Sequence, residues 1–341
     1  MTAVAYAFWN NKGGTGKTSL AFQSIVLYAE AHSSKRVLVL DVCPQANLSE
    51  LLLGGLNNKG SDKLLARQGL VPRCSVGGYF QLRLPSPYIP PAFDATDFIT
   101  TPHNFNTKVP ENIDLVCGDP LLELQANAVN TLANNQIPGS NPWIAVVDWI
   151  KDFLEQVEDD YDVVFLDCNP SFSLYTQIAL SACDLIILPV MADDSSRRAI
   201  QNAFSLVYGL KLPSEIYSAY AFATKLKAAG RLLPKVHLIV KNRITQYMGT
   251  ASAYGAVLAS IESDVGKVLK TNPEIFNFKK SADGFIAVRD FQTTGVVAFA
   301  KGLPFSQVQV GKQTINGHRV QVKKDYLDNA RDAMGELVAR L

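Results

Sequence analysis

The sequence has few charged residues and no long apolar run. Charged side chains make up 18% of its 341 residues, against roughly 25% in an average soluble protein, which excludes disorder, a coiled coil and a solvated charged rod. The longest apolar runs, around Val163–Leu166 and Leu185–Val190, are far shorter than the roughly 18 residues of a membrane helix. The N-terminus lacks the basic and apolar segments of a signal peptide. We therefore expect a cytoplasmic protein that does not bind membranes.

Cysteine pairs with the spacing of a zinc site are also absent. There are five cysteines, an odd number, and no two of them form a CxxC motif. Such a pattern is typical of a reduced intracellular protein without disulfides. The five are Cys43, Cys74, Cys117, Cys168 and Cys183, and core packing is the favoured role of Cys168 and Cys183, which adjoin predicted buried strands.

No excess of one charge is present, because 32 Lys and Arg stand against 31 Asp and Glu. Contact with nucleic acid would therefore require a local basic patch. The segment Ile216–Ile261 contains six basic residues and no acidic one. Four of them are our candidate DNA-binding residues: Lys225, Lys227, Arg231 and Lys235. The alternative is a solvated surface whose acidic neighbours come from elsewhere in the chain.

Apolar residues are abundant, at 48%, and they occur in short runs separated by longer amphipathic stretches. This alternation predicts an α/β fold with a doubly wound, mostly parallel sheet and helices on both faces. A helix is predicted at Lys17–Ala31. Strands are predicted at Val4–Trp9, Arg36–Leu40, Ile113–Val116, Val163–Leu166, Leu185–Pro189 and Val236–Val240. In such a fold ligands bind beyond the carboxyl ends of the strands.

Two segments depart from this alternation, although we expect a single domain over 1–341. Seven of the 17 prolines lie within Pro72–Pro110, and we predict an irregular insertion at about 54–110. It is either ordered or a mobile loop, and its aromatic residues favour packing. A helical region is predicted at about 245–341, ending in an amphipathic helix at Asp325–Leu341 that docks on the core.

A glycine-rich segment joins the first predicted strand to the first helix. A loop in this position directs several backbone N–H groups, together with the helix N-terminus, at one anion. In such a loop Lys17 reaches the β- and γ-phosphates of a nucleotide and Thr18 is a ligand of Mg²⁺. The predicted ATP-binding residues of the loop are Lys12, Gly13, Gly14, Thr15, Gly16, Lys17, Thr18 and Ser19.

The segment Lys12–Ser19 resembles the deviant Walker A motif of the ParA/MinD family of P-loop ATPases. Asp41–Ser49 is similar to the second motif of that family, and Tyr161–Ser171 is similar to its Walker B strand, in which the final aspartate, here Asp167, holds the Mg²⁺ shell. The matching segments run in order from Val4 to about Arg243. Pro44–Asn47 and the absence of a basic amphipathic helix at the end of the chain favour ParA over MinD.

The resemblance implies further roles for individual residues. Lys12 would reach across an ATP-sandwich dimer to the nucleotide of the other subunit, and Asn242 would contact adenine. Asp193 would lie near the nucleotides of the dimer. Lys12, Lys17, Asp41 and Cys43 form the candidate catalytic set.

Cys43 departs from the family pattern, because most members carry an aspartate there that orients the attacking water. A thiol of ordinary pKa is mostly neutral at pH 7 and accepts hydrogen bonds weakly. We therefore expect slow hydrolysis, with Asp41 or Asp193 as possible substitutes for the missing carboxylate. The alternative is that Cys43 only packs.

The resemblance implies a ParA-type ATPase that uses ATP and Mg²⁺, dimerises with ATP and binds DNA non-specifically. A ParB-like adaptor or cargo protein would stimulate its slow hydrolysis, and the protein would associate with the nucleoid. A second hypothesis is an ATP-gated dimeric scaffold or regulator that binds a protein partner and no DNA. An electron-transfer ATPase is disfavoured, because Cys74 and Cys117 do not lie in segments resembling cluster-binding loops.

Overall fold

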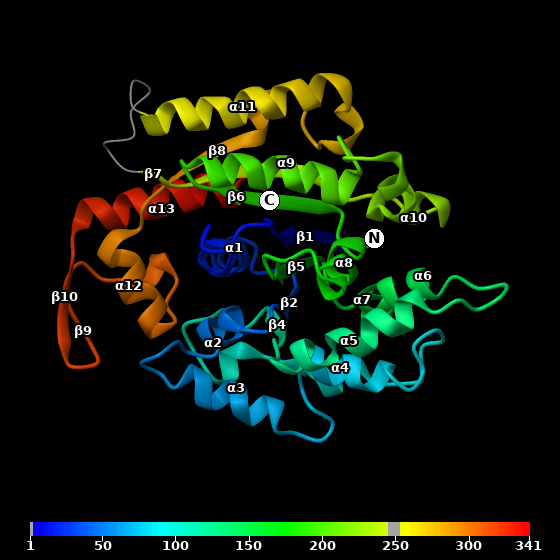
Figure 1. Ribbon diagram of the computed structural model, residues 1–341. Helices are drawn as coiled ribbons and strands as arrows, with labels where there is room; N and C mark the ends of the chain where they lie inside the picture. The colour runs from blue at the N-terminus through cyan, green and yellow to red at the C-terminus, as the bar shows by residue number, and fades with distance from the viewer. Residues whose placement is uncertain (1–2, 245–252) are drawn as a thin grey trace.

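The computed structural model describes residues 3–244 and 253–341, and within these ranges a central sheet has eight strands (Figure 1). The spatial order is β3-β4-β2-β5-β1-β6-β7-β8, and of the described pairs only β3–β4 is antiparallel. The strands are β1 (Val4–Phe8), β2 (Val37–Val42), β3 (Ile99–Thr100), β4 (Ile113–Val116), β5 (Val163–Cys168), β6 (Leu185–Val190), β7 (Lys235–Ile244) and β8 (Phe285–Arg289).

Both faces of the sheet are buried, because neighbouring residues of each central strand are apolar and point to opposite sides. On β1, Ala5 and Ala7 belong to one hydrophobic cluster, and Tyr6 and Phe8 to the other. The first cluster is covered by α4 (Val76–Arg83), α5 (Leu121–Asn134), α6 (Pro142–Val147), α7 (Trp149–Glu155), α8 (Leu174–Ser181), α9 (Asp194–Tyr208), α10 (Phe222–Ala228) and α11 (Ala253–Thr271). The second is covered by α1 (Lys17–Ala31), α2 (Asn47–Leu52), α3 (Gly60–Gln68), α12 (Gln292–Lys301) and α13 (Lys324–Val338). The predicted doubly wound fold is thereby confirmed.

The segment 54–110 is more regular than its composition indicates, since it contains α3, α4 and the edge strand β3. The side chain of Ser75 caps α4 by accepting a hydrogen bond from the backbone N–H of Gly78. Tyr79, Phe93 and Phe98 pack around Phe153 of α7, with ring centroids 5.1 to 6.4 Å from it. These aromatic contacts anchor the segment to the body of the protein.

The C-terminal part is not purely helical. Besides α11, α12 and α13 it contributes β8 to the main sheet and a separate hairpin of β9 (Gly311–Ile315) and β10 (His318–Val322). The first residues of the predicted region, 245–252, lie outside the described residues. The buried face of α13 is the predicted one, formed by Leu327, Ala330, Met334, Leu337 and Val338. No helix within the described ranges is long and apolar enough to cross a membrane.

Candidate functional site

The glycine-rich loop connects β1 to α1 at the carboxyl edge of the sheet, and two of its glycines have positive φ. Gly14 has φ 74° and Gly16 has φ 83°, values that only glycine adopts without strain. A Cβ atom at Gly16 would lie 2.2 Å from Nδ2 of Asn242. That amide, at the end of β7, donates a hydrogen bond of 2.8 Å to the carbonyl of Thr15. The loop is therefore held against β7 by a contact that requires glycine.

Lys17 begins α1 and is 7% exposed. Its Nζ donates a hydrogen bond of 3.2 Å to the carbonyl of Lys12, so the amine lies under the loop. Burial lowers the pKa of Lys17, while the nearby carboxylate of Asp167 opposes this effect. A buried amine of this kind favours an anion, and phosphate oxygens beside the loop would supply the missing negative charge.

Thr18 and Asp167 meet beside the loop, where the Thr18 hydroxyl donates a 2.8 Å hydrogen bond to Oδ2 of Asp167. Oδ1 of the same carboxylate is buried and has no hydrogen-bond partner among the described residues. Burial raises the pKa of Asp167, and the adjacent Asp41 adds to this rise. A bound cation would favour the ionised form. A hydroxyl and one carboxylate fit Mg²⁺, which usually takes few protein ligands and completes its shell with water and phosphate oxygens.

Lys12 lies on the outer side of the loop and pairs with Asp193 at the start of α9. Its Nζ is 2.7 and 2.5 Å from the two carboxylate oxygens and 3.2 Å from Oγ of Ser196. Asp193 also caps α9 by accepting a hydrogen bond from the backbone N–H of Ser196. The Asp193 side chain is 40% exposed, so the Lys12 pair borders solvent, whereas the Lys17 amine lies beneath the loop.

Asp41 and Cys43 lie where β2 leads into α2. Asp41 is fully buried, and its carboxylate accepts hydrogen bonds from the backbone N–H of Cys43 and from the N–H and hydroxyl of Ser49. These hydrogen bonds hold the turn between β2 and α2. Cys43 is 7% exposed. Burial, with Asp41 and Asp167 nearby, raises the pKa of its thiol to about 12, so the thiol is neutral near pH 7.

A cavity of about 230 Å³ opens beside the loop. Its lining includes Gly16, Ser19 and Asn242 together with Phe291, Gln292 and Phe299 from α12 and the turn before it. The aromatic wall fits a purine ring next to the phosphate loop. No motif in the sequence identifies the α12 residues, because only the β8–α12 connection brings them here.

Sequence reasoning also missed Asn10. This residue is fully buried, and its Nδ2 donates a 2.6 Å hydrogen bond to the carbonyl of Pro189 at the end of β6. Its Oδ1 has no partner among the described residues. A polar residue immediately after a buried strand was the available signal, and the contact fixes the start of the loop.

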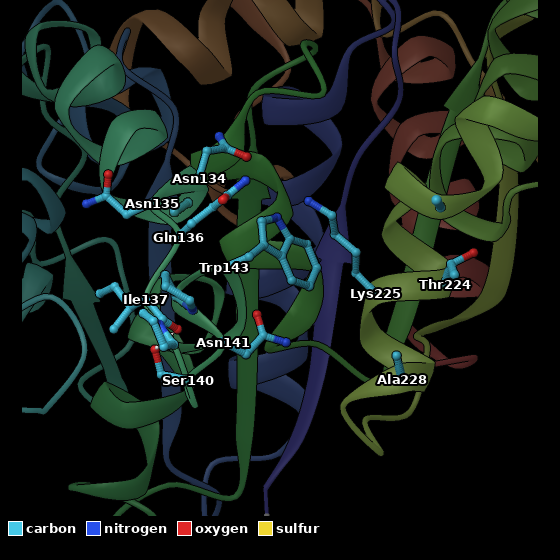
Figure 2. A pocket seen from close by; sticks show the side chains of 14 residues that line it. Asn134, Asn135, Gln136, Ile137, Ser140, Asn141, Trp143, Thr224, Lys225 and Ala228 are labelled. Atoms are coloured by element: carbon cyan, nitrogen blue, oxygen red, sulfur yellow. Dashed lines mark hydrogen bonds between the residues drawn. The ribbon is translucent and has the colours of Figure 1, made fainter.

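The four candidate DNA-binding residues lie near the opposite edge of the sheet, on and after α10. Arg231 forms an ion pair with Asp148, and the Nζ of Lys225 lies 4.9 Å from the centre of the Trp143 ring. Figure 2 shows Lys225 and Trp143 in a pocket of about 760 Å³ that Asn134, Gln136 and Asn141 also line. Lys227 and Lys235 are exposed. The acidic residue Asp148 thus neutralises part of the positive charge of the predicted DNA-binding patch.

Comparison with known proteins agrees with this geometry. The family model described as an AAA domain (AAA_31) matches residues 3–212. The sporulation initiation inhibitor protein Soj of Bacillus subtilis is 30% identical over 188 residues, which cover 55% of this chain and 58% of Soj. The chain spans about half the length of the curated relatives it matches.

Solved structures with a similar fold cover nearly all of the chain. Apo McdA of Cyanothece has a TM-score of 0.60 at 13% identity, with 98% of each chain covered. The pNOB8 ParA protein bound to nonspecific DNA has a TM-score of 0.50 at 16% identity, with 88% of this chain and 94% of the other covered. The family match over most of the chain, the phosphate loop and the shared fold lead to one conclusion: the chain belongs to the ParA/MinD-type family of P-loop ATPase domains.

Proposed function

We propose that this protein is a ParA-type ATPase that binds ATP with Mg²⁺, forms an ATP-sandwich dimer on non-specific DNA, and positions a DNA or other large cargo. The observation that carries the proposal is the pair of lysines in one loop. Lys17 lies buried beneath the loop, and Lys12 lies at its outer side next to solvent. One lysine is thus suited to the phosphates of its own subunit, and the other to those of a facing subunit.

Lys12 has to leave Asp193 to contact a second subunit. A partly exposed ion pair contributes only about 0.2–1 kcal/mol. Breaking the pair with Asp193 so that Lys12 can bind a nucleotide phosphate therefore costs little free energy. The pair with Asp193 keeps the amine close to the loop without trapping it. Lys12 is therefore available for a nucleotide that only a dimer encloses.

Hydrolysis should be slow without a partner protein. Phosphoryl transfer depends mainly on positioning and charge, and here Lys17, the loop N–H groups and the Thr18–Asp167 pair supply both. Mg²⁺ held by Thr18 and Asp167 would neutralise charge on the phosphates. The neutral thiol of Cys43 is a poor acceptor for a water proton, so hydrolysis is slow. A ParB-like adaptor or cargo protein would then increase the rate of ATP hydrolysis.

The alternative is an ATP-gated dimer that acts on a protein partner without DNA. The ion pair of Arg231 with Asp148 and the position of Lys225 over Trp143 favour it, because both weaken the basic patch predicted near α10.

The test combines light scattering with a gel shift on random-sequence duplex DNA, without nucleotide, with ADP and with MgATP. We expect a dimer and a DNA shift only with MgATP. Lys17→Ala should lose nucleotide binding, dimer and shift together, and Lys35→Ala, at an exposed lysine outside every candidate site, is a matched control. A MgATP dimer that shifts no DNA would favour the scaffold, and a protein that binds no nucleotide would refute both.

A further inference from the structure

The β9–β10 hairpin lies at the margin of the molecule next to α12 and α13 (Figure 1). Its strands join through Asn316 and Gly317, which both have positive φ, as a two-residue hairpin turn requires. One face of the ribbon packs inwards: Val322 is buried, and Ile315 and Val320 pack against the second hydrophobic cluster. The hairpin is therefore a formed element with a defined outer face.

The outer face consists only of side chains that can donate hydrogen bonds. In the register of the hairpin, Lys312 pairs with Gln321, and Thr314 with Arg319. All four are exposed. Lys312 and Arg319 are diagonal neighbours on this face, a separation of about 7–8 Å for such pairs. Two cations and two neutral donors thus lie side by side with no acidic group between them.

The two cations of this face have no acidic neighbour in the surrounding sequence and no ion pair among the described residues. From Phe291 to Lys324 there is no Asp or Glu, while five lysines and arginines occur. Within the described ranges neither Lys312 nor Arg319 has an acidic partner at ion-pair distance. In the α10 region, by contrast, Arg231 pairs with Asp148 and Lys225 lies over the Trp143 ring, which leaves only Lys227 and Lys235 of the four candidates unpaired among the described residues.

We propose that the outer face of the β9–β10 hairpin is the surface with which this protein contacts the phosphates of duplex DNA. The proposal rests on the proposed function and adds a location to it. Lysine, arginine, threonine and glutamine are typical donors to phosphate oxygens. A two-stranded ribbon also has the width that the major groove of B-DNA admits. Contacts to phosphates alone carry no sequence information, in keeping with non-specific binding.

The hairpin is also physically close to the nucleotide cavity. It packs on α12, and Lys301 at the end of this helix donates a 2.8 Å hydrogen bond to the side chain of Gln313 in β9. The start and middle of α12, with Gln292 and Gly295, line the cavity beside Gly16 of the phosphate loop. One helix therefore contacts both the candidate ATP site and the candidate DNA surface.

The experiment measures binding of a fluorescent 24-base-pair random duplex by anisotropy with MgATP, for the full chain and two charge-reversal variants. Lys312→Glu/Arg319→Glu should weaken binding at least tenfold. Lys227→Glu/Lys235→Glu, with the same change of charge near α10, should bind like the parent protein. Binding of a fluorescent ATP analogue should be unchanged in both, because the substituted side chains are exposed.

A milder variant keeps the test independent of folding. Between 50 and 200 mM salt, Lys312→Ala/Arg319→Ala should lose about tenfold less affinity than the parent protein loses. The reason is that log K changes by about 0.9 per phosphate contact for each tenfold in salt, and the variant lacks two contacts. If the parent protein binds DNA and the hairpin variants bind equally well, the hairpin proposal is overturned and the proposed function stands. If the parent protein with MgATP binds no duplex, DNA binding itself is refuted, and the hairpin proposal fails with it.

Discussion

Substitution of Cys43 by aspartate tests whether the missing carboxylate limits hydrolysis. Burial, with the carboxylates of Asp41 and Asp167 nearby, raises the pKa of the thiol from 9.0 to about 12. Such a thiol is neutral and contributes little to water activation. Cys43→Asp should therefore accelerate MgATP turnover, by up to about 10²-fold, the lower end of what a positioned acid–base group supplies.

The same environment sets the cost of the substitution. A rise of about three in pKa corresponds to about 4 kcal/mol against a negative charge, and a carboxylate at position 43 would meet the same burial and the same neighbours. Its pKa would therefore lie above its ordinary value of about 4 in the folded state. A raised folded-state pKa costs stability as pH rises above the pKa of the unfolded state. Without nucleotide, the variant should therefore lose further stability relative to the parent protein as pH rises from 5 to 8.

Turnover and melting temperature are measured together, at both pH values and with or without MgATP. Cys43→Asn is the matched control, because it has the shape of aspartate without its charge, and Cys43→Ala removes the sulfur. Cys43→Asn should show neither the pH-dependent loss nor the faster turnover. If Cys43→Asp and Cys43→Asn melt alike at pH 8, the electrostatic reasoning is wrong. A rapid parent enzyme that loses its activity in Cys43→Ala would make the thiol catalytic.

Three further predictions concern the phosphate loop. Lys12→Ala should still bind ATP but form no ATP-dependent dimer; a normal dimer in light scattering would refute the role of Lys12 across the interface. Gly16→Ala should lower the melting temperature and weaken nucleotide binding, because a Cβ would displace Asn242 and φ is 83°, whereas Gly13→Ala, with open space around it, should melt like the parent protein. Burial alone would raise the pKa of Asp193. Hydrogen bonds, of which the bond from Lys12 has the largest effect, instead lower this pKa to about 2. This lowered pKa adds stability above about pH 4 that is lost as pH falls towards 2, so Asp193→Asn should lose less stability than the parent protein in acid titrations followed by circular dichroism.

Local patterns in the sequence were sufficient for six strands of the sheet and for the phosphate loop. A strand buried on both faces has to be apolar throughout, so β1, β2, β4, β5, β6 and β7 are visible as short apolar runs. The loop between β1 and α1 is equally local, since its glycines, Lys17 and Thr18 act within a few residues of one another. The same holds for α13, whose apolar positions recur with helical spacing.

Segments without such periodicity were not predictable in the same way. The helices α3 and α4 are short and lie among Gly, Asn and Pro, and α4 is stabilised by aromatic contacts with α7 that the local sequence does not contain. The strands β9 and β10 contain no continuous apolar run, and the short run of β8, Phe285–Val288, was missed. Their pairing with distant or adjacent strands, and not their composition, defines them.

The contacts that distinguish the candidate sites join residues far apart in the chain. Asn242 reaches the carbonyl of Thr15 across 227 positions, and Lys12 reaches Asp193 across 181. The pairing of Arg231 with Asp148 and the free outer face of the hairpin are likewise products of packing. Sequence alone determined which residues can bind phosphate, because that chemistry depends on residue type and local spacing. Only the tertiary structure decided which charges are neutralised and which face solvent, because electrostatic pairing depends on distance in space.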